Sequence, residues 1–277
     1  MFVKNGTGVL KRVLLSKPEY LKAVKINEIA KKWGDDLDLE EMKKEHEILV
    51  KSYEDNGVKV EYLEADHERP NSVFARDFGG CVKEGYILGN FKLPIRYKEH
   101  EDYEKKMKEL NIPIVARVEK GFFEGGDFMF LNENTIAIGM ADRTNEEGVE
   151  EIRSQISKYG YEVIGVKLKR EYLHLDMCFN LVDDNIAVSY EDGLPEDFAK
   201  RIKDMGIDII SVSEESIFEH GCNLQAIGNH KVLSLKKNKI VNNELRKRGM
   251  TVIELDIIEI LKAGGGPHCM TFPLERI

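Results

Sequence analysis

The sequence predicts an α/β protein made of five similar units arranged around a common axis. The first observation is a recurring order of strand, strand, helix and strand, with a polar turn between the two leading strands. The second is that four copies pass from a Gly or Asn directly into a β-branched strand. One such unit cannot bury a core alone, so five should pack with helices outside and strands along a central channel. An ordinary α/β domain of alternating strands and helices is the alternative.

The clearest copy begins at Phe128. Residues 128–139 predict two strands joined by a turn at Asn132–Asn134, and residues 161–166 predict the third strand. Between them, residues 146–160 predict a helix that ends at Gly160. Its apolar positions recur at helical spacing: Val149, Ile152 and Ile156.

The other copies repeat this order. Each should contain two short leading strands joined by an Asn-, Asp- or Gly-containing turn, then a helix and a third strand. They occupy residues 9–64, 79–118, 178–212 and 223–256. No linker, low-complexity stretch or charge block divides the chain, so residues 1–277 are predicted to form a single domain.

Composition restricts the function. The net charge is −9 and the pI is near 5.5, which argues against broad nucleic-acid binding but allows a small cationic substrate. The N-terminal residues do not resemble a signal peptide, and no apolar run reaches the ~20 residues of a membrane helix. We therefore expect a cytoplasmic protein without membrane contact.

Cysteine and histidine usage predicts neither a metal site nor a cofactor. No CxxC pair and no three- or four-ligand spacing set is present. Three cysteines fall in strand-like segments and are expected to serve packing: Cys81, Cys178 and Cys222. Five histidines in polar contexts are expected at the surface: His46, His67, His100, His220 and His230.

Polar residues that do not serve the repeat precede the first strand of successive units, so a closed ring would gather them. Asp77 lies in PNSVFARDFGG, where a surface turn is the simpler interpretation. Glu124 and Asp127 flank Gly125–Gly126 among phenylalanines. Buried acids need partners, so these two favour a functional role.

Two further segments complete the set. His174 and Asp176 stand two residues apart in EYLHLDMCFNL, and in a strand they would share one face. A lone His there would usually be a core residue, and the paired Asp makes the two interpretations equal. Cys269 follows AGGGPH, a Gly-rich turn that lets backbone approach a ligand; an inert buried Cys is the alternative. Together these residues could supply a nucleophile, an acid/base, an orienting carboxylate and a cation clamp.

The motifs ARD (75–77), EGGD (124–127), HLD (174–176) and GGGPHC (264–269) resemble those of the guanidino-group-modifying pentein superfamily. This superfamily comprises arginine deiminases, dimethylarginine hydrolases and amidinotransferases, and it implies a five-bladed α/β propeller, with a homodimer as a further expectation. The resemblance to arginine deiminases assigns Arg96 and Arg143 to the substrate's α-carboxylate, and assigns Asn71, six residues before Asp77, to substrate binding. His268 departs from the Arg of deiminases and is similar to amidinotransferases. The acid of HLD is one that dimethylarginine hydrolases typically lack.

The resemblance implies a reaction. Asp77 and Asp176 would clamp a guanidinium with Asp127 nearby, Cys269 would attack its carbon, and His174, oriented by Glu124, would act as acid and base. The expected outcome is hydrolysis of L-arginine to citrulline and ammonia. Amidino transfer, dimethylarginine hydrolysis and full decomposition to ornithine are alternatives. A non-catalytic ribosome-binding propeller is the alternative from another class.

Overall fold

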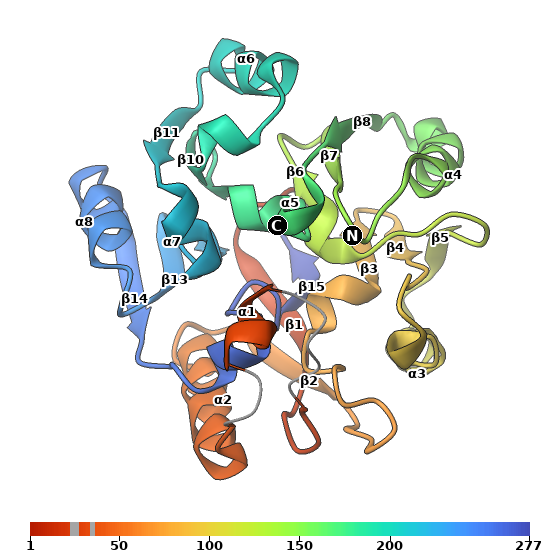
Figure 1. The fold of residues 1–277 in the computed structure, drawn as a ribbon. Helices are drawn as coiled ribbons and strands as arrows, with labels where there is room; N and C mark the ends of the chain where they lie inside the picture. The colour runs from red at the N-terminus through yellow and green to blue at the C-terminus, as the bar shows by residue number, and fades with distance from the viewer. Residues whose placement is uncertain (23–27, 34–36) are drawn as a thin grey trace.

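A computed structural model describes residues 1–22, 28–33 and 37–277 of the chain. Its strands form five separate three-stranded sheets arranged in a ring (Figure 1). In sheet order the strands are β15 (Phe272–Arg276), β1 (Leu10–Ser16) and β2 (Lys59–Leu63); β3 (Gly79–Val82), β4 (Gly85–Leu88) and β5 (Ile114–Arg117); β6 (Phe128–Phe130), β7 (Thr135–Met140) and β8 (Glu162–Lys167); β9 (Phe179–Asp183), β10 (Ile186–Ser189) and β11 (Asp208–Ser211); β12 (Gln225–Gly228), β13 (Lys231–Leu235) and β14 (Thr251–Leu255). The predicted five-bladed α/β propeller is confirmed.

Every sheet has the same internal order. The first strand pairs antiparallel with the second, and the second pairs parallel with the third. The parallel step needs a crossover, and a helix supplies it in each unit. These helices are α2 (Leu39–Glu54), α3 (Glu99–Glu109), α4 (Glu146–Ile156), α6 (Glu196–Asp204) and α8 (Lys239–Lys247), and they lie on the outside of the ring (Figure 1).

The shorter helices lie nearer the axis. They are α1 (Glu28–Trp33), α5 (Leu175–Cys178) and α7 (Glu214–Phe218). Single turns of 3-10 helix also occur at Ala75–Phe78, Pro94–Arg96, Gly125–Asp127, Ser157–Tyr159, Arg170–Tyr172, Glu191–Gly193 and Ile260–Ala263.

The ring closes differently from the expected contiguous repeats. The copy predicted at residues 9–64 supplies only β1 and β2, and its leading strand is β15 from the C-terminal end. Val13 pairs with Pro273 and Leu14 with Phe272. The expectation that this copy contains two adjacent leading strands is therefore wrong, because the two ends of the chain share one blade.

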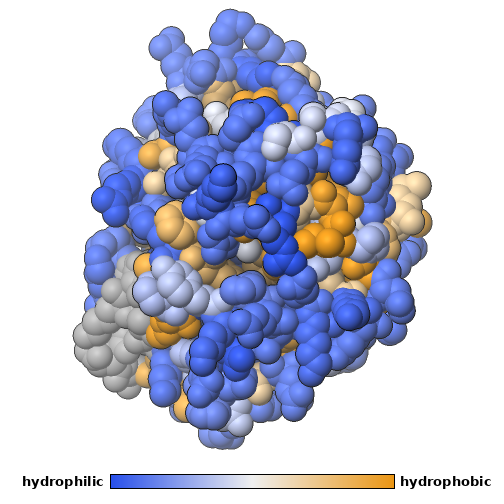
Figure 2. Space-filling model, turned by 90° about the vertical axis from the view of Figure 1, so that its right-hand side faces the viewer, coloured by the Kyte–Doolittle hydropathy of each residue, from blue (hydrophilic) through white to orange (hydrophobic). Residues whose placement is uncertain are grey.

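Aromatic packing joins this shared blade to its neighbour. The ring of Phe78 stacks on Tyr103 with centroids 4.1 Å apart and lies 4.0 Å from the ring centroid of Phe272. Apolar side chains of the strands fill the interior, whereas one face of the molecule is mostly hydrophilic with scattered apolar patches (Figure 2). Among the helices described in residues 1–22, 28–33 and 37–277, none combines the length and apolar character that crossing a membrane requires.

Candidate active site

The segments that precede the leading strands converge at one end of the propeller. The turns Ala75–Phe78 and Gly125–Asp127 lead into β3 and β6, and α5 leads into β9. Asn223 stands before β12, and Cys269 stands before β15. Each blade therefore delivers polar side chains from an equivalent position, and the site is assembled from residues far apart in the sequence.

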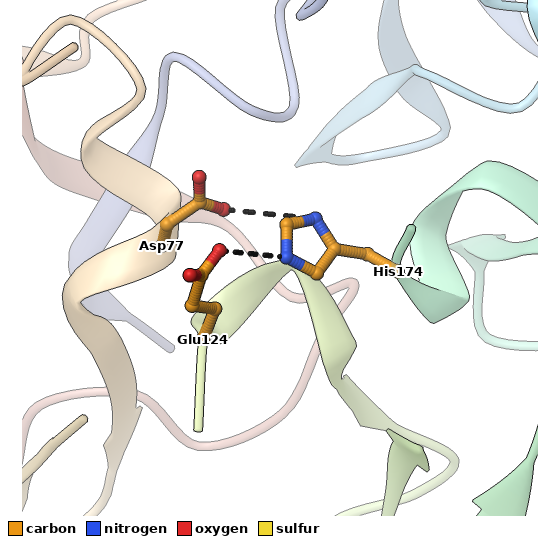
Figure 3. A group of neighbouring side chains, drawn as sticks. All are labelled: Asp77, Glu124 and His174. Atoms are coloured by element: carbon orange, nitrogen blue, oxygen red, sulfur yellow. Dashed lines mark hydrogen bonds and ion pairs between the residues drawn. The ribbon is translucent and has the colours of Figure 1, made fainter. Parts of the chain in front are cut away.

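An imidazole lies between two carboxylates at this end (Figure 3). His174 Nε2 is 3.0 Å from Glu124 Oε2, and His174 Nδ1 is 4.0 Å from Asp77 Oδ1. All three side chains are buried. A Cβ on Gly126 would lie 2.6 Å from His174 Nδ1, so the glycine leaves the space that the ring occupies.

The carboxylates around the buried imidazole determine its charge. Desolvation alone would lower the pKa of His174, but the carboxylates of Asp77, Glu124 and Asp127 outweigh it and raise the pKa to about 10. The ring is therefore an imidazolium at neutral pH. At Glu124, burial alone would raise the pKa. The hydrogen bond from His174 and the charge of the nearby Arg143 instead hold the pKa of Glu124 below its usual value.

The thiol belongs to a second cluster. Asn223 Nδ2 donates to Cys269 Sγ at 2.9 Å, and Asp176 Oδ2 lies 3.8 Å from the same sulfur. His268 Nδ1 donates to Asp176 Oδ2 at 2.8 Å, and the His268 backbone N–H donates to Asn223 Oδ1 at 2.9 Å. Of the four cysteines, Cys269 is the only one that is not fully buried. Burial and the charges of Asp176 and Asp77 raise the pKa of the thiol well above its usual value.

The HLD segment differs from the expected strand. His174 is extended and immediately precedes α5, while Asp176 lies within that helix. The turn sends His174 toward Glu124 and Asp176 toward His268. The prediction that both side chains share one face of a strand is therefore wrong, although both reach the same end of the ring.

Asp127 has both oxygens engaged within the protein. Its Oδ1 accepts from the Leu175 backbone N–H at 2.8 Å, and its Oδ2 accepts from Thr144 Oγ1 at 2.6 Å. Burial raises the pKa of Asp127 to about 7. These contacts anchor the start of α5, which carries Asp176 and follows His174.

The two arginines of the expected carboxylate end are buried and ion-paired, not solvated. Arg96 Nη1 is 2.5 Å from Asp77 Oδ2, and its Nη2 is 2.7 Å from Glu99. Arg143 Nη1 is 3.7 Å from Glu124 Oε1, and its Nε donates to Asp142 Oδ2 at 3.0 Å. Both guanidinium groups thus hold carboxylates that border the imidazole.

Asn71 is also buried and adjoins this group. Its backbone carbonyl accepts from Arg96 Nη2 at 3.4 Å. Its side-chain Oδ1 has no hydrogen-bond partner among the described residues. A buried amide oxygen without a partner is unusual and marks a place where a donor can be received.

Three buried carboxylate oxygens also lack a hydrogen-bond partner among the described residues. Asp77 Oδ1, Glu124 Oε1 and Asp176 Oδ1 are buried and accept no hydrogen bond from any described part of the chain. Desolvated carboxylate oxygens without donors are unfavourable. Their presence beside one thiol and one imidazolium creates an acceptor set suited to a multivalent N–H donor.

A surface hollow leads to these segments. Its volume is about 300 Å³, and its lining includes Leu173, Met177 and Gly264 together with Asp142 and Arg170. Leu173 is adjacent to His174, and Gly264 begins the Gly-rich loop before Cys269. The hollow therefore borders the segments that carry His174 and Cys269.

The cluster offers one arrangement with the spacing of a metal site. Ligand atoms of Asp77, Glu124 and His174 lie within 4.8 Å of one another. However, the nearby carboxylates raise the pKa of the imidazole to about 10, so the protonated ring donates to Glu124 and forms an ion pair with Asp77 instead of ligating through a lone pair. These three side chains therefore fit an imidazolium between two carboxylates better than they fit a bound metal ion.

Two histidine expectations are wrong. His46 and His220 are buried, and burial lowers the pKa of each to about 4. His67 and His230 are exposed, as expected, and His100 is half-buried. The three packing cysteines are buried, as predicted, but only Cys81 lies in a strand; Cys178 ends α5 and Cys222 lies in the turn before β12.

Two contacts escaped the sequence interpretation. Asn223 was counted only as the start of a repeat, although it occupies the same place before a leading strand as Asp77, Asp127 and Asp176. The role of His268 in holding Asp176 was also missed. Comparing equivalent positions of all five units would have identified Asn223.

A five-bladed propeller with this buried group of thiol, imidazolium and carboxylates defines a pentein protein of the guanidino-group-modifying class. Residues 17–276 match the family described as "N,N dimethylarginine dimethylhydrolase, eukaryotic". The chain belongs to this family.

Relatives and solved structures agree with this placement. The chain is 31% identical to an uncharacterized Bacillus subtilis protein, YkgA, over 97% of this chain and 93% of the relative. It is 27% identical to an arginine deiminase of Bacillus thuringiensis subsp. konkukian over 75% of this chain, and the match spans 62% of the deiminase.

Two solved structures share the fold. The N-terminal domain of ArgZ, an arginine dihydrolase from cyanobacteria, has a TM-score of 0.86 at 21% identity, with 96% of this chain and 97% of that chain covered. A dimethylarginine dimethylaminohydrolase adduct has a TM-score of 0.80 at 23% identity, with 96% and 100% covered. Family and fold together support a guanidino-group enzyme acting on C–N bonds.

Proposed function

We propose that the chain hydrolyses L-arginine to citrulline and ammonia through a covalent intermediate on Cys269. The observation that carries this proposal is the set of three buried carboxylate oxygens without donors, on Asp77, Glu124 and Asp176. An arginine guanidinium offers five N–H donors. A dimethylated nitrogen offers none, so the unmethylated group satisfies this acceptor set better.

The substrate cation would activate the nucleophile. In the empty site, burial and the charges of Asp176 and Asp77 keep the thiol of Cys269 protonated. A guanidinium between these carboxylates cancels their field and lowers the pKa of the thiol, which releases its proton to solvent. The hydrogen bond from Asn223 then stabilises the thiolate.

Bond breaking then depends on the imidazolium. The thiolate attacks the guanidinium carbon, and a tetrahedral adduct forms. His174, protonated because its pKa is about 10, gives its proton to the departing nitrogen, so the C–N bond breaks and ammonia leaves. The product of this half-reaction is an S-alkylthiouronium on Cys269.

The same imidazole serves the second half. Neutral His174 takes a proton from water, and the resulting hydroxide attacks the thiouronium carbon. The C–S bond breaks, the hydroxyl proton of the adduct passes to the departing thiolate and restores the thiol, and citrulline is released. The sum is arginine plus water giving citrulline plus ammonia, and Glu124 keeps the ring in place throughout.

The α-carboxylate end would be read by arginines. Arg143 adjoins Asp142, which lines the 300 Å³ hollow, and is the better placed of the two. Arg96 and Asn71 border Asp77 from the opposite side. The α-carboxylate of the incoming substrate would compete with the acidic side chains that pair with these guanidinium groups.

Hydrolysis of dimethylarginine is the second candidate, because the chain belongs to a family that bears this substrate's name. The test assays the purified protein with arginine, Nω,Nω-dimethylarginine, and arginine plus glycine, and resolves products by mass spectrometry. Citrulline and ammonia from arginine, at the highest kcat/KM, would support the proposal. Faster release of dimethylamine, formation of ornithine, or transfer to glycine would each replace it with the corresponding reaction.

A further inference from the structure

The central channel contains a small cavity separate from the substrate hollow. It has a volume of about 30 Å³ and is lined by residues of the leading strands, including Gln225 and Arg276, and of the turns that precede them, including Arg76 and His268. This space holds roughly two water-sized molecules. His268 forms part of its wall and bonds Asp176 through Nδ1, so the cavity adjoins the thiol cluster without belonging to it.

Arg276 is a buried cation with no acidic partner. It is 1% exposed, and its Nη1 and Nη2 donate to the backbone carbonyls of Gly8 and Ala226 at 2.7 and 2.8 Å. Its Nε has no hydrogen-bond partner among the described residues, and the groups whose charge affects its pKa are Arg76 and Tyr53, neither of which is a carboxylate. Carbonyl groups satisfy hydrogen bonds but leave the net charge in place.

Arg76 adds a second positive charge to the same cavity. Its Nε and Nη2 also donate to backbone carbonyls, of Gly125 at 3.0 Å and of Phe128 at 2.8 Å. Burial, and then the charge of Arg76, lower the pKa of Arg276 to about 9. The carboxylates of Asp176 and Asp77 offset part of the charge of Arg76, whereas Arg276 has no such acid, so it is Arg276 that calls for a negative charge within the cavity.

Gln225 indicates that the cavity also holds a hydrogen-bond donor. Its Nε2 donates to the Ala226 carbonyl at 2.8 Å, and its Oε1 is buried without a partner among the described residues. This oxygen needs a donor, whereas Arg276 Nε needs an acceptor. An anion next to Arg276 and a water next to Gln225 satisfy both groups.

We propose that the channel binds a small monovalent anion such as chloride between Arg276 and Arg76, with one water bridging to Gln225. The small volume leaves no room for a tetrahedral oxyanion together with that water. This site does not depend on which guanidine the enzyme hydrolyses. It makes the anion an internal counter-ion of the propeller.

Bromide locates the site directly, because it replaces chloride and scatters anomalously. Crystals of the whole chain soaked in sodium bromide should show a peak within about 3.5 Å of Arg276 Nε. Absence of a peak in the channel, with density explained by water alone, would overturn the proposal.

Solution measurements test the same site. At equal ionic strength, the Tm should be roughly 2–4 °C higher in sodium chloride than in sodium gluconate. Gln225→Glu places a carboxylate in the cavity, so this variant should gain stability in gluconate and lose the response to chloride. Asn134→Asp adds the same charge on an exposed turn and should keep the response. An equal Tm of the unaltered chain in both salts would contradict the proposal, whatever the variants do.

Discussion

The side-chain amide of Asn223 donates to Cys269 Sγ at 2.9 Å, although the two residues are 46 positions apart. The same asparagine receives the backbone N–H of His268 through its Oδ1. One side chain thus fixes the Gly-rich loop and contacts the sulfur. A hydrogen bond to a thiolate lowers the pKa of the thiol, so Asn223 should control the reactivity of Cys269.

Replacing Asn223 should therefore slow alkylation. We expect Asn223→Ala to reduce the rate of Cys269 labelling by 2-chloroacetamidine about 10-fold at pH 7.5, in line with a thiol pKa raised by about one unit. Stopped-time mass spectrometry measures this rate. Asn134→Ala, at an exposed turn, should leave it unchanged, and equal rates in both variants would remove Asn223 from thiolate stabilisation.

Cys269 itself should be dispensable for folding and indispensable for turnover. Cys269→Ser keeps the size of the side chain, so its circular dichroism and Tm should remain close to those of the unaltered chain. It should release no ammonia from arginine. Cys81→Ala, which removes a buried thiol, should retain turnover, whereas ammonia release by Cys269→Ser would end the covalent mechanism.

His174 should make stability depend on alkaline pH. Its folded pKa of about 10 lies above its unfolded value near 6.5, so the folded state holds an extra proton between these limits. The stabilisation is complete below pH 6.5 and is lost as the pH rises through 10, at up to ~1.4 kcal/mol per pH unit.

Urea unfolding at pH 7, 8 and 9 measures this slope. The free energy of unfolding should fall with pH in the unaltered chain and in His67→Asn, which changes an exposed residue. His174→Asn should flatten the decline. A slope that persists in His174→Asn would show that the extra proton resides elsewhere.

Gly126 should be needed for the position of the imidazole. Gly126→Ala places a methyl group 2.6 Å from His174 Nδ1 and must displace the ring. Loss of the general acid should lower kcat on the order of 10²-fold. Gly165→Ala is a matched control, since its Cβ meets only the flexible end of Met140 at 2.8 Å. Equal kcat values for the two variants would contradict this role.

Arg143 should distinguish substrates by their carboxylate. Arg143→Ala should raise KM for arginine at least 10-fold, while KM for agmatine, which lacks the carboxylate, changes little. Steady-state kinetics with both guanidines gives the comparison. Similar increases for both would show that Arg143 acts on the cluster through Glu124 alone.

The sequence predicted the architecture because repetition is visible without contacts. The alternation of strands and helices and the polar residues before each leading strand revealed the five units and the positions of Asp77, Glu124 and His174. Ring closure could not be predicted, because the pairing of β15 with β1 depends on contacts between the two ends of the chain.

Side-chain partners were harder to predict than positions. Arg96 and Arg143 would be read from the sequence as surface residues, and only the fold shows that both are buried and ion-paired with acids of their own blade. Alternating apolar residues in the HLD segment predict a strand. The structure has the short helix α5 there instead, and Asp127 accepts the Leu175 N–H at the start of this helix. Long-range capping of this kind leaves no local signal in the sequence.

The sharing of one blade between the two ends has a consequence for biosynthesis. Cys269 stands three residues before β15, which follows the other fourteen strands in the order of the sequence. Until this strand pairs with β1, the thiol lacks both its Asn223 contact and its acidic surroundings. A chain in which β15 has not paired with β1 should therefore turn over no substrate, and the catalytic centre should arise only when this blade closes.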